Sequence, residues 1–199
     1  MLNLERLVEL HGFEDGIRWR LSGDGLLLEG QAVPVGTGGP PRTVDRIWKA
    51  FGPTIAQAAA EHGVPAELIL ATIATESRGN PMAERAEPGF VSHEETPSRV
   101  SIGLMQTLIS TARMALKQDA LTASDLRKPE VAIAAGTAYI ASQKKITAFD
   151  PPKVACAYNA GGLYRNDGAA NRWRMRQFPI GTGAHADRFV AWFNACLSG

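Results

Sequence analysis

Residues 65–76 read PAELILATIATE, and their spacing predicts a helix. Pro65 stands where a helix can begin, because the first turn does not need the N–H group that proline lacks. Ile69 and Ile73 follow the 3.6-residue period of a helix, and Glu76 continues the same face three residues further along. Partial burial on that face favours the protonated carboxyl group that a general acid needs. The alternative at this point is an ordinary glutamate exposed on the last turn.

The same helical punctuation continues along residues 43–199. Prolines stand where helices could begin, and glycines follow helical runs as C-terminal caps would. These residues are Pro53, Pro65, Pro129 and Pro152 at the starts and Gly63 and Gly161 at the ends. We therefore expect a mainly α fold, a compact bundle of about six or more short helices.

Residues 1–42 differ from this body, and we interpret them as an appendage with a small β-hairpin that ends in a linker. Alternating residues indicate two strands around a turn rich in glycine. The segments are a short helix at 4–10, strands at 17–21 and 26–29, and a linker at 36–41. We expect the hairpin to dock on the helical body or to touch the substrate, without contributing a catalytic group. The predicted domains are thus 1–42 and 43–199.

The composition is that of a soluble globular protein, because 45% of the 199 residues are hydrophobic and 21% are charged. A chain of this length buries enough surface to fold without a disulfide or metal, which excludes disordered and disulfide-stapled classes. No window holds the run of about 18 apolar residues that a membrane span needs. The first residues do not resemble a secretory leader, so we expect no passage through the general secretion route.

Charge is unevenly distributed, although the formal net charge is only +1. Residues 1–100 carry 14 acidic and 9 basic residues, whereas residues 101–199 carry 6 and 12. One polar stretch holds Arg165, Arg172, Arg174 and Arg176. This pattern favours weak contact of the C-terminal half with an anionic wall polymer or membrane face, and it is too weakly basic for a nucleic-acid binder. The alternative is a solvated loop whose charges bind nothing.

Common catalytic and metal-binding motifs do not occur in the chain. It has no HExxH, CxxC or GxSxG sequence and no P-loop, and His93-Glu94-Glu95 is only a fragment of a zinc motif. Cys156 and Cys196 lie in apolar helical patterns, so we expect two free, packed thiols rather than a bridge. We therefore expect neither a metal nor a cofactor.

Three short segments carry a family resemblance when they are taken in order. They are Glu76-Ser77 with Asn80-Pro81, Gly103-Leu104-Met105-Gln106 with Thr111-Ala112, and Ala157-Tyr158-Asn159-Ala160-Gly161-Gly162. Over roughly residues 48–197 the chain resembles the lytic transglycosylase and goose-type lysozyme superfamily. The resemblance implies a lysozyme-like helical domain that cleaves the β-1,4 bond between N-acetylmuramic acid and N-acetylglucosamine in peptidoglycan strands.

The resemblance also assigns roles to residues of this chain. Glu76 is expected to be the catalytic acid that protonates the leaving oxygen. Gly103 is expected to let the backbone approach the glycan, and the Gln106 amide to bind hydroxyl or N-acetyl groups. The full set of expected substrate-binding residues is Ser77, Gly103, Gln106, Tyr139, Tyr158 and Asn159. The expected product has 1,6-anhydro ends, and the expected setting is a monomeric bacteriophage endolysin.

The chain departs from the family in a long polar connection at residues 82–102. Glu94 and Glu95 within it could supply a second carboxylate, as in an inverting muramidase, or the segment could be a mobile lid over the glycan. A further alternative is a wall-binding module that no longer cuts. We expect the protein to stay in the host cytoplasm until its release to the periplasm, or alternatively to be a virion component.

Overall fold

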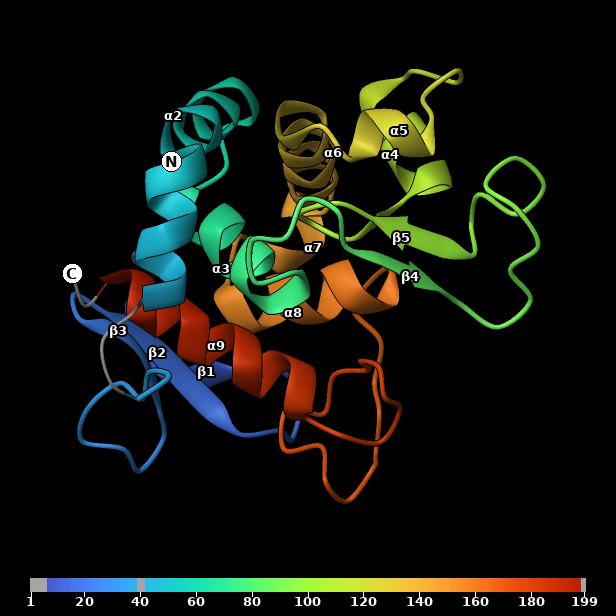
Figure 1. Cartoon of the computed structure of the whole chain (residues 1–199). Helices are drawn as coiled ribbons and strands as arrows, with labels where there is room; N and C mark the ends of the chain where they lie inside the picture. The colour runs from blue at the N-terminus through green and yellow to red at the C-terminus, as the bar shows by residue number, and fades with distance from the viewer. Residues whose placement is uncertain (1–6, 39–41, 198–199) are drawn as a thin grey trace. The chain divides into compact units, whose positions relative to one another are not determined.

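A computed structural model describes residues 7–38 and 42–197 (Figure 1). The chain forms two compact units. One unit joins the residues up to Val44 to the residues from Gln143 onward, and the other comprises Asp45–Ser142. The predicted boundary at residue 42 stays a prediction. Among the described helices, none has the length and apolar character needed to cross a membrane.

The Asp45–Ser142 unit is built mainly of helices, two of which are apolar and buried. Its helices are α2 (Arg42–His62, which begins just before the unit), α3 (Ala66–Glu76), α4 (Ile109–Leu116), α5 (Ala123–Leu126) and α6 (Pro129–Ser142). Every residue of α3 from Leu68 to Thr75 is buried, and α6 is buried along most of its length. Because these two helices are apolar on nearly all sides, they form the centre of the unit.

Pro53 does not begin a helix, contrary to the expectation from its sequence position. It lies inside α2, on the exposed side of that helix. A proline removes one backbone hydrogen bond, and a solvent-facing carbonyl can bond to water instead. The other expected boundaries hold: α6 begins at Pro129, and Gly63 follows the last residue of α2 with a φ of +62°.

A small antiparallel sheet lies between α3 and α4 in the chain, where the sequence pattern predicted no strands. It consists of β4 (Glu84–Ala86), β5 (Val100–Ile102) and β6 (Thr107–Leu108). Its register pairs Glu84 with Ile102 and Ile102 with Thr107. Val100 and Ile102 are buried in an apolar cluster with Ile109 and Leu126, so the sheet is held by the same core as α4 and α5.

The other unit combines a second antiparallel sheet with helices from the C-terminal part of the chain. Its elements are β1 (His11–Gly12), β2 (Arg18–Ser22), β3 (Gly25–Leu28), α7 (Lys144–Thr147), α8 (Pro151–Ala160) and α9 (Ala184–Leu197). The expected hairpin is β2–β3, closed by a two-residue turn between Ser22 and Gly25. The prediction of a mainly α fold with a small N-terminal hairpin is confirmed. The expected helix at 4–10 begins outside the described residues, of which Leu7 and Val8 are helical.

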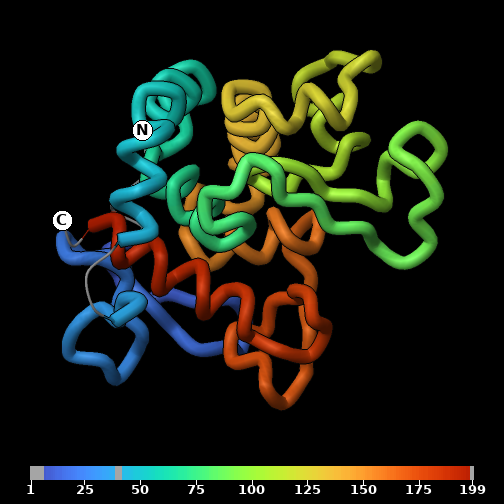
Figure 2. Tube along the Cα trace, viewed as in Figure 1, coloured from blue at the N-terminus to red at the C-terminus, as the bar shows by residue number. Residues whose placement is uncertain are grey.

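The N-terminal sheet is docked tightly within its unit, beside α9 (Figure 2). Trp19 is fully buried, and its indole N–H donates to Asp150 Oδ1 at 2.8 Å. The backbone N–H of Leu26 donates to Asn194 Oδ1 at 2.7 Å, and the Asn194 amide donates back to the Leu26 carbonyl. The expected docking of the hairpin is confirmed.

The two cysteines are free, as predicted. Cys156 is fully buried in α8, and Cys196 is half-buried in α9. Burial raises the pKa of the Cys156 thiol far above its usual range, because the thiolate cannot be solvated there.

Candidate active site

Glu76 ends α3, the most deeply buried helix of its unit. The helix starts after Pro65, as predicted, and its last residue is Glu76. The Glu76 side chain is half-buried, which agrees with its position on an apolar face. A carboxyl group here is held by a rigid helix at the edge of the core, which is the placement expected for a group that must transfer a proton to a defined atom.

Ser77 braces the end of this helix. Its Oγ donates to the carbonyl of Leu104 at 2.6 Å and accepts a hydrogen bond from the backbone N–H of Gly79 at 3.2 Å. The hydroxyl therefore ties Glu76 to the turn between β5 and β6. The geometry supports a positioning role for Ser77, and its expected contact with substrate stays a prediction.

Gly103 opens that turn with a φ of +79°. Its backbone N–H donates to the Ala83 carbonyl at 2.8 Å. A Cβ at this position would lie 2.1 Å from the carbonyl oxygen of Leu126, far inside van der Waals contact. The structure thus gives another reason for glycine than the one inferred from sequence, namely close approach to protein backbone. Contact of Gly103 with glycan stays a prediction.

Gln106 closes the same turn with its side-chain amide. Its Nε2 donates to the carbonyls of Ala83 at 2.9 Å and Gly103 at 3.1 Å, and its Oε1 accepts from Ser101 Oγ at 3.1 Å. Both amide hydrogens therefore have partners within the protein. Gln106 therefore stabilises the same turn to which Ser77 bonds. The structure brings three predicted residues together at this turn, next to the end of α3: Ser77, Gly103 and Gln106.

The three remaining predicted residues lie on other helices. Tyr139 is half-buried on α6 in the same unit as Glu76. Tyr158 and Asn159 lie together in the last turn of α8, in the other unit, and both are half-buried. The side-chain oxygen Oδ1 of Asn159 accepts a hydrogen bond from the backbone N–H of Phe178 at 2.6 Å. Asn159 therefore also anchors the long connection that follows α8.

The connection between β4 and β5 carries Glu94 and Glu95, and both side chains are exposed. Internal hydrogen bonds close this connection, including Glu87 N–H to the Arg99 carbonyl at 2.7 Å. Phe90 packs against the apolar cluster of α4 and α5. Backbone groups and one aromatic side chain of this loop are thus engaged within the protein, and the expected closure of the segment over the glycan stays a prediction.

An ion cluster fastens the same connection to the body. His93 donates to Glu84 Oε1 at 3.0 Å, and Arg127 donates to the other oxygen of that carboxylate. Burial opposes the charged form of Glu84, but the hydrogen bonds from His93 and Arg127 outweigh it and lower the pKa of this carboxyl below its ordinary value. These contacts hold His93, the neighbour of Glu94, against β4.

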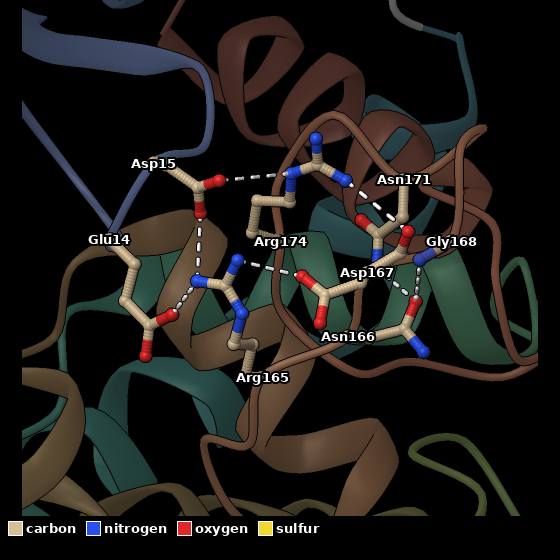
Figure 3. Close-up of polar contacts among 8 residues, drawn as sticks. All are labelled: Glu14, Asp15, Arg165, Asn166, Asp167, Gly168, Asn171 and Arg174. Atoms are coloured by element: carbon tan, nitrogen blue, oxygen red, sulfur yellow. Dashed lines mark hydrogen bonds and ion pairs between the residues drawn. The ribbon is translucent and has the colours of Figure 1, made fainter.

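A polar cluster in the other unit was not anticipated beyond the presence of its arginines (Figure 3). Arg165 forms ion pairs with Glu14, Asp15 and Asp167. Arg174 Nε lies 3.9 Å from Asp15 Oδ2, and Arg172 pairs with Asp187 at 2.6 Å. The arginine run in the sequence was the available signal, but it could not indicate which carboxylates lie beside each guanidinium.

The family model "Transglycosylase SLT domain" matches residues 53–177. One similar structure is the lytic transglycosylase Slt from Pseudomonas aeruginosa, an inactive Glu-to-Gln variant. Its sequence is 20% identical and the TM-score is 0.54, and the match covers 76% of this chain and 24% of the Pseudomonas aeruginosa chain. The 70 kDa soluble lytic transglycosylase from Escherichia coli is 19% identical with a TM-score of 0.52, and the match covers 75% of this chain and 26% of the Escherichia coli chain.

The chain thus spans about a quarter of the length of these two proteins. At this level of identity the likeness concerns the fold, and it confirms the expected lysozyme-like helical architecture. No curated protein sequence matches the chain. The matched residues 53–177 include all three segments on which the sequence resemblance rested.

Proposed function

Because this chain belongs to the transglycosylase SLT domain family, we propose that it cleaves the β-1,4 bond between N-acetylmuramic acid and N-acetylglucosamine in peptidoglycan. The observation that carries the proposal is the family match over residues 53–177, which includes Glu76 and the α8 segment with Tyr158. The product that we propose is a strand with a 1,6-anhydro-N-acetylmuramic acid end.

In the proposed reaction Glu76 acts first as an acid and then as a base. Its carboxyl proton moves to the glycosidic oxygen while the bond from that oxygen to C1 of N-acetylmuramic acid breaks. The resulting carboxylate then accepts the proton of the C6 hydroxyl while O6 bonds to C1 of the same sugar. Glu76 is protonated again at the end, and no water is consumed.

The position of Glu76 supports this role. It is half-buried in the last turn of α3, so a rigid helix holds its carboxyl group at a defined place at the edge of the core. The similar Pseudomonas aeruginosa protein is an inactive variant in which a glutamate is replaced by glutamine. This change supports a glutamate as the essential group in proteins of this fold.

We assign the other predicted residues to two tasks. Ser77 and Gln106 hold the turn beside Glu76 through the hydrogen bonds described above, so their first task is to position the acid. Tyr139, Tyr158 and Asn159 are half-buried and polar, and we propose that they contact sugar hydroxyl or N-acetyl groups.

Mass spectrometry of the digestion products tests the proposal directly. Purified peptidoglycan sacculi are incubated with the protein, and the released fragments are analysed without a reduction step. We expect 1,6-anhydro ends. Reducing ends would instead indicate a muramidase with a second carboxylate, for which Glu94 and Glu95 were the sequence candidates. Binding to sacculi without any released fragment would indicate a wall-binding module.

The biological setting stays a proposal of its own. We propose that the chain acts in host lysis as an endolysin kept in the host cytoplasm until its release to the periplasm, with a virion component as the alternative. An assay on permeabilised Gram-negative cells tests the lytic part, because an enzyme acting alone should lower the turbidity of the suspension. Unchanged turbidity, together with cleavage of purified sacculi, would contradict a lytic role.

A further inference from the structure

Arg176 stands apart from the other arginines of the connection between α8 and α9. Arg165, Arg172 and Arg174 each lie within 4 Å of a carboxylate of their own unit. Arg176 has no such partner within residues 7–38 and 42–197, and its Nε is buried without a hydrogen-bond acceptor. A guanidinium held in a partly buried place without a counter-charge is prepared to bind an anion, because its desolvation has already occurred.

The Arg176 guanidinium is fixed in place by Tyr164. Its central carbon lies 4.3 Å from the centre of the Tyr164 ring, a cation–π arrangement. The backbone N–H of Arg176 also donates to the Tyr164 carbonyl at 2.7 Å, so the two residues are joined by main chain as well as by side chains. The Tyr164 side chain is 47% exposed, which leaves part of the ring accessible to a ligand.

This pair is joined at two points to the end of α8 that carries Tyr158 and Asn159. Gly162 lies against the Tyr164 ring so closely that a Cβ there would be 3.0 Å from the phenol oxygen. Two residues after Arg176, the backbone N–H of Phe178 donates to Asn159 Oδ1 at 2.6 Å. The Phe178 ring is 52% exposed, so the same region offers a second accessible aromatic surface.

We propose that Arg176 and Tyr164 form a carboxylate subsite for peptidoglycan, next to the α8 residues that contact the sugar. This inference rests on the proposed function for the identity of the polymer. Peptidoglycan carries carboxylates on its stem peptides, and on the lactyl group of N-acetylmuramic acid where the peptide has been removed. The planar guanidinium can bind either one through paired N–H donors, while the aromatic rings pack against sugar or peptide.

Binding of three small probes to the full chain tests the subsite by calorimetry. The first is the disaccharide of N-acetylglucosamine and N-acetylmuramic acid with its tetrapeptide. The second is the same disaccharide with a free lactyl carboxylate, and the third is neutral di-N-acetylchitobiose. None contains the bond to be cleaved, so binding does not depend on turnover. We expect at least one acidic probe to bind about tenfold more tightly than chitobiose. Which acidic probe is preferred identifies the source of the carboxylate.

The variant R176Q should lose this preference, with acidic and neutral probes then bound within about twofold of each other. R174Q is the matched control, because it removes the same charge two residues away and should keep the preference. R176K keeps the charge without the planar pair of N–H donors, and we expect it to bind the acidic probes with intermediate affinity. If thermal melting shows that R176Q does not fold, R176K replaces it as the test variant.

Two results would overturn the subsite: a wild-type protein that binds chitobiose as tightly as both acidic probes, or equal losses in R176Q and R174Q. Failure to cleave sacculi would count against the proposed function instead. The binding experiments could still be interpreted, because the probes are not cleaved.

Discussion

At the residue scale, substitution of Glu76 is the most direct test of the proposed acid. The eight preceding residues of α3 are buried, and Glu76 itself is half-buried, so an amide of equal size should leave the packing intact. We expect Glu76→Gln to lower the cleavage rate by about 10²–10⁴-fold, the usual contribution of a general acid. The rate is measured on purified sacculi, and the melting temperature is compared with that of wild type.

Glu61→Gln is the matched control for this experiment, since Glu61 is an exposed carboxylate on α2 of the same unit. It should retain full activity. A Glu76→Gln protein that keeps more than about a tenth of the wild-type rate would refute the acid role.

Gly103 tests how much the turn beside Glu76 depends on close backbone packing. Alanine there combines a left-handed φ with a Cβ placed 2.1 Å from the Leu126 carbonyl oxygen. We expect Gly103→Ala to lower the free energy of unfolding by about 3 kcal/mol or more. Gly63 has a φ of +62° but open space around it, so Gly63→Ala should cost only about 1 kcal/mol. Urea denaturation measures the free energy of unfolding of both variants. Equal losses would show that the structure shifts to relieve the overlap between the new Cβ and the Leu126 carbonyl.

At the scale of elements, the N-terminal sheet is part of a core. Trp19 on β2 is fully buried and contacts Trp173 edge-on, with ring centroids 5.3 Å apart. We expect Trp19→Ala to lower the free energy of unfolding by about 3–5 kcal/mol. Trp48→Ala is the control, because Trp48 is 46% exposed on α2, and we expect a loss within about 1 kcal/mol.

The same burial revises an expectation about truncation. Since the sequence predicts that the hairpin contributes no catalytic group, deletion of residues 1–40 is expected from sequence to leave cleavage of a small glycan intact. The structure predicts instead that this deletion destabilises the unit that also contains α8 and α9, since Trp19 donates to Asp150 at the start of α8 and Leu26 donates to Asn194 on α9. A folded, active deletion protein with a wild-type melting temperature would contradict this prediction.

The contact between β1 and the start of α8 predicts a pH dependence. His11 Nε2 donates to the buried Asp150 carboxylate at 3.0 Å, and this hydrogen bond raises the pKa of His11 above its ordinary value of 6.5, against the opposing effects of burial and Lys153. The folded protein therefore holds this proton more tightly than the unfolded chain does. The stabilisation is complete below about pH 6.5 and is lost as the pH rises through the higher pKa of the folded state.

We thus expect the free energy of unfolding to fall with rising pH across this window, and His11→Gln to flatten the slope. His62→Gln, at the end of α2, is the matched control and should leave the slope as it is. Urea denaturation at a series of pH values is the measurement. An identical slope in wild type and His11→Gln would show that the pair does not control stability.

At the scale of the whole molecule, the product of cleavage distinguishes the proposed reactions. Glu94 and Glu95 are exposed on an anchored connection, which fits a contribution to binding better than a role as catalytic base. We expect the double variant E94A/E95A to lose less than about fivefold in activity and to give the same 1,6-anhydro products, because a missing general base would cost about 10²-fold or more. Mass spectrometry of the products decides. Reducing ends from wild type, lost with all activity in the double variant, would establish an inverting hydrolase.

Local pattern was sufficient for much of this protein. The helix ending at Glu76, the β2–β3 hairpin, the start of α6 at Pro129 and the free cysteines all follow from periodicity and turn chemistry. These features depend on residues a few positions apart, whose geometry the backbone itself restricts. The order of three short segments was enough to indicate the family, although each segment alone is only moderately specific.

Only the tertiary structure decided which distant groups meet. His11 and Trp19 bond to Asp150, more than 130 residues away, and Ser77 bonds to Leu104. The sequence also did not show which arginine between α8 and α9 is left without a carboxylate, because pairing depends on how distant segments pack together and on which buried polar groups must be satisfied. No local period carries that information. The sequence therefore determined most of the helices, the hairpin and the family, whereas packing decided which groups hold the end of α3 at Glu76 and which arginine is left without a carboxylate.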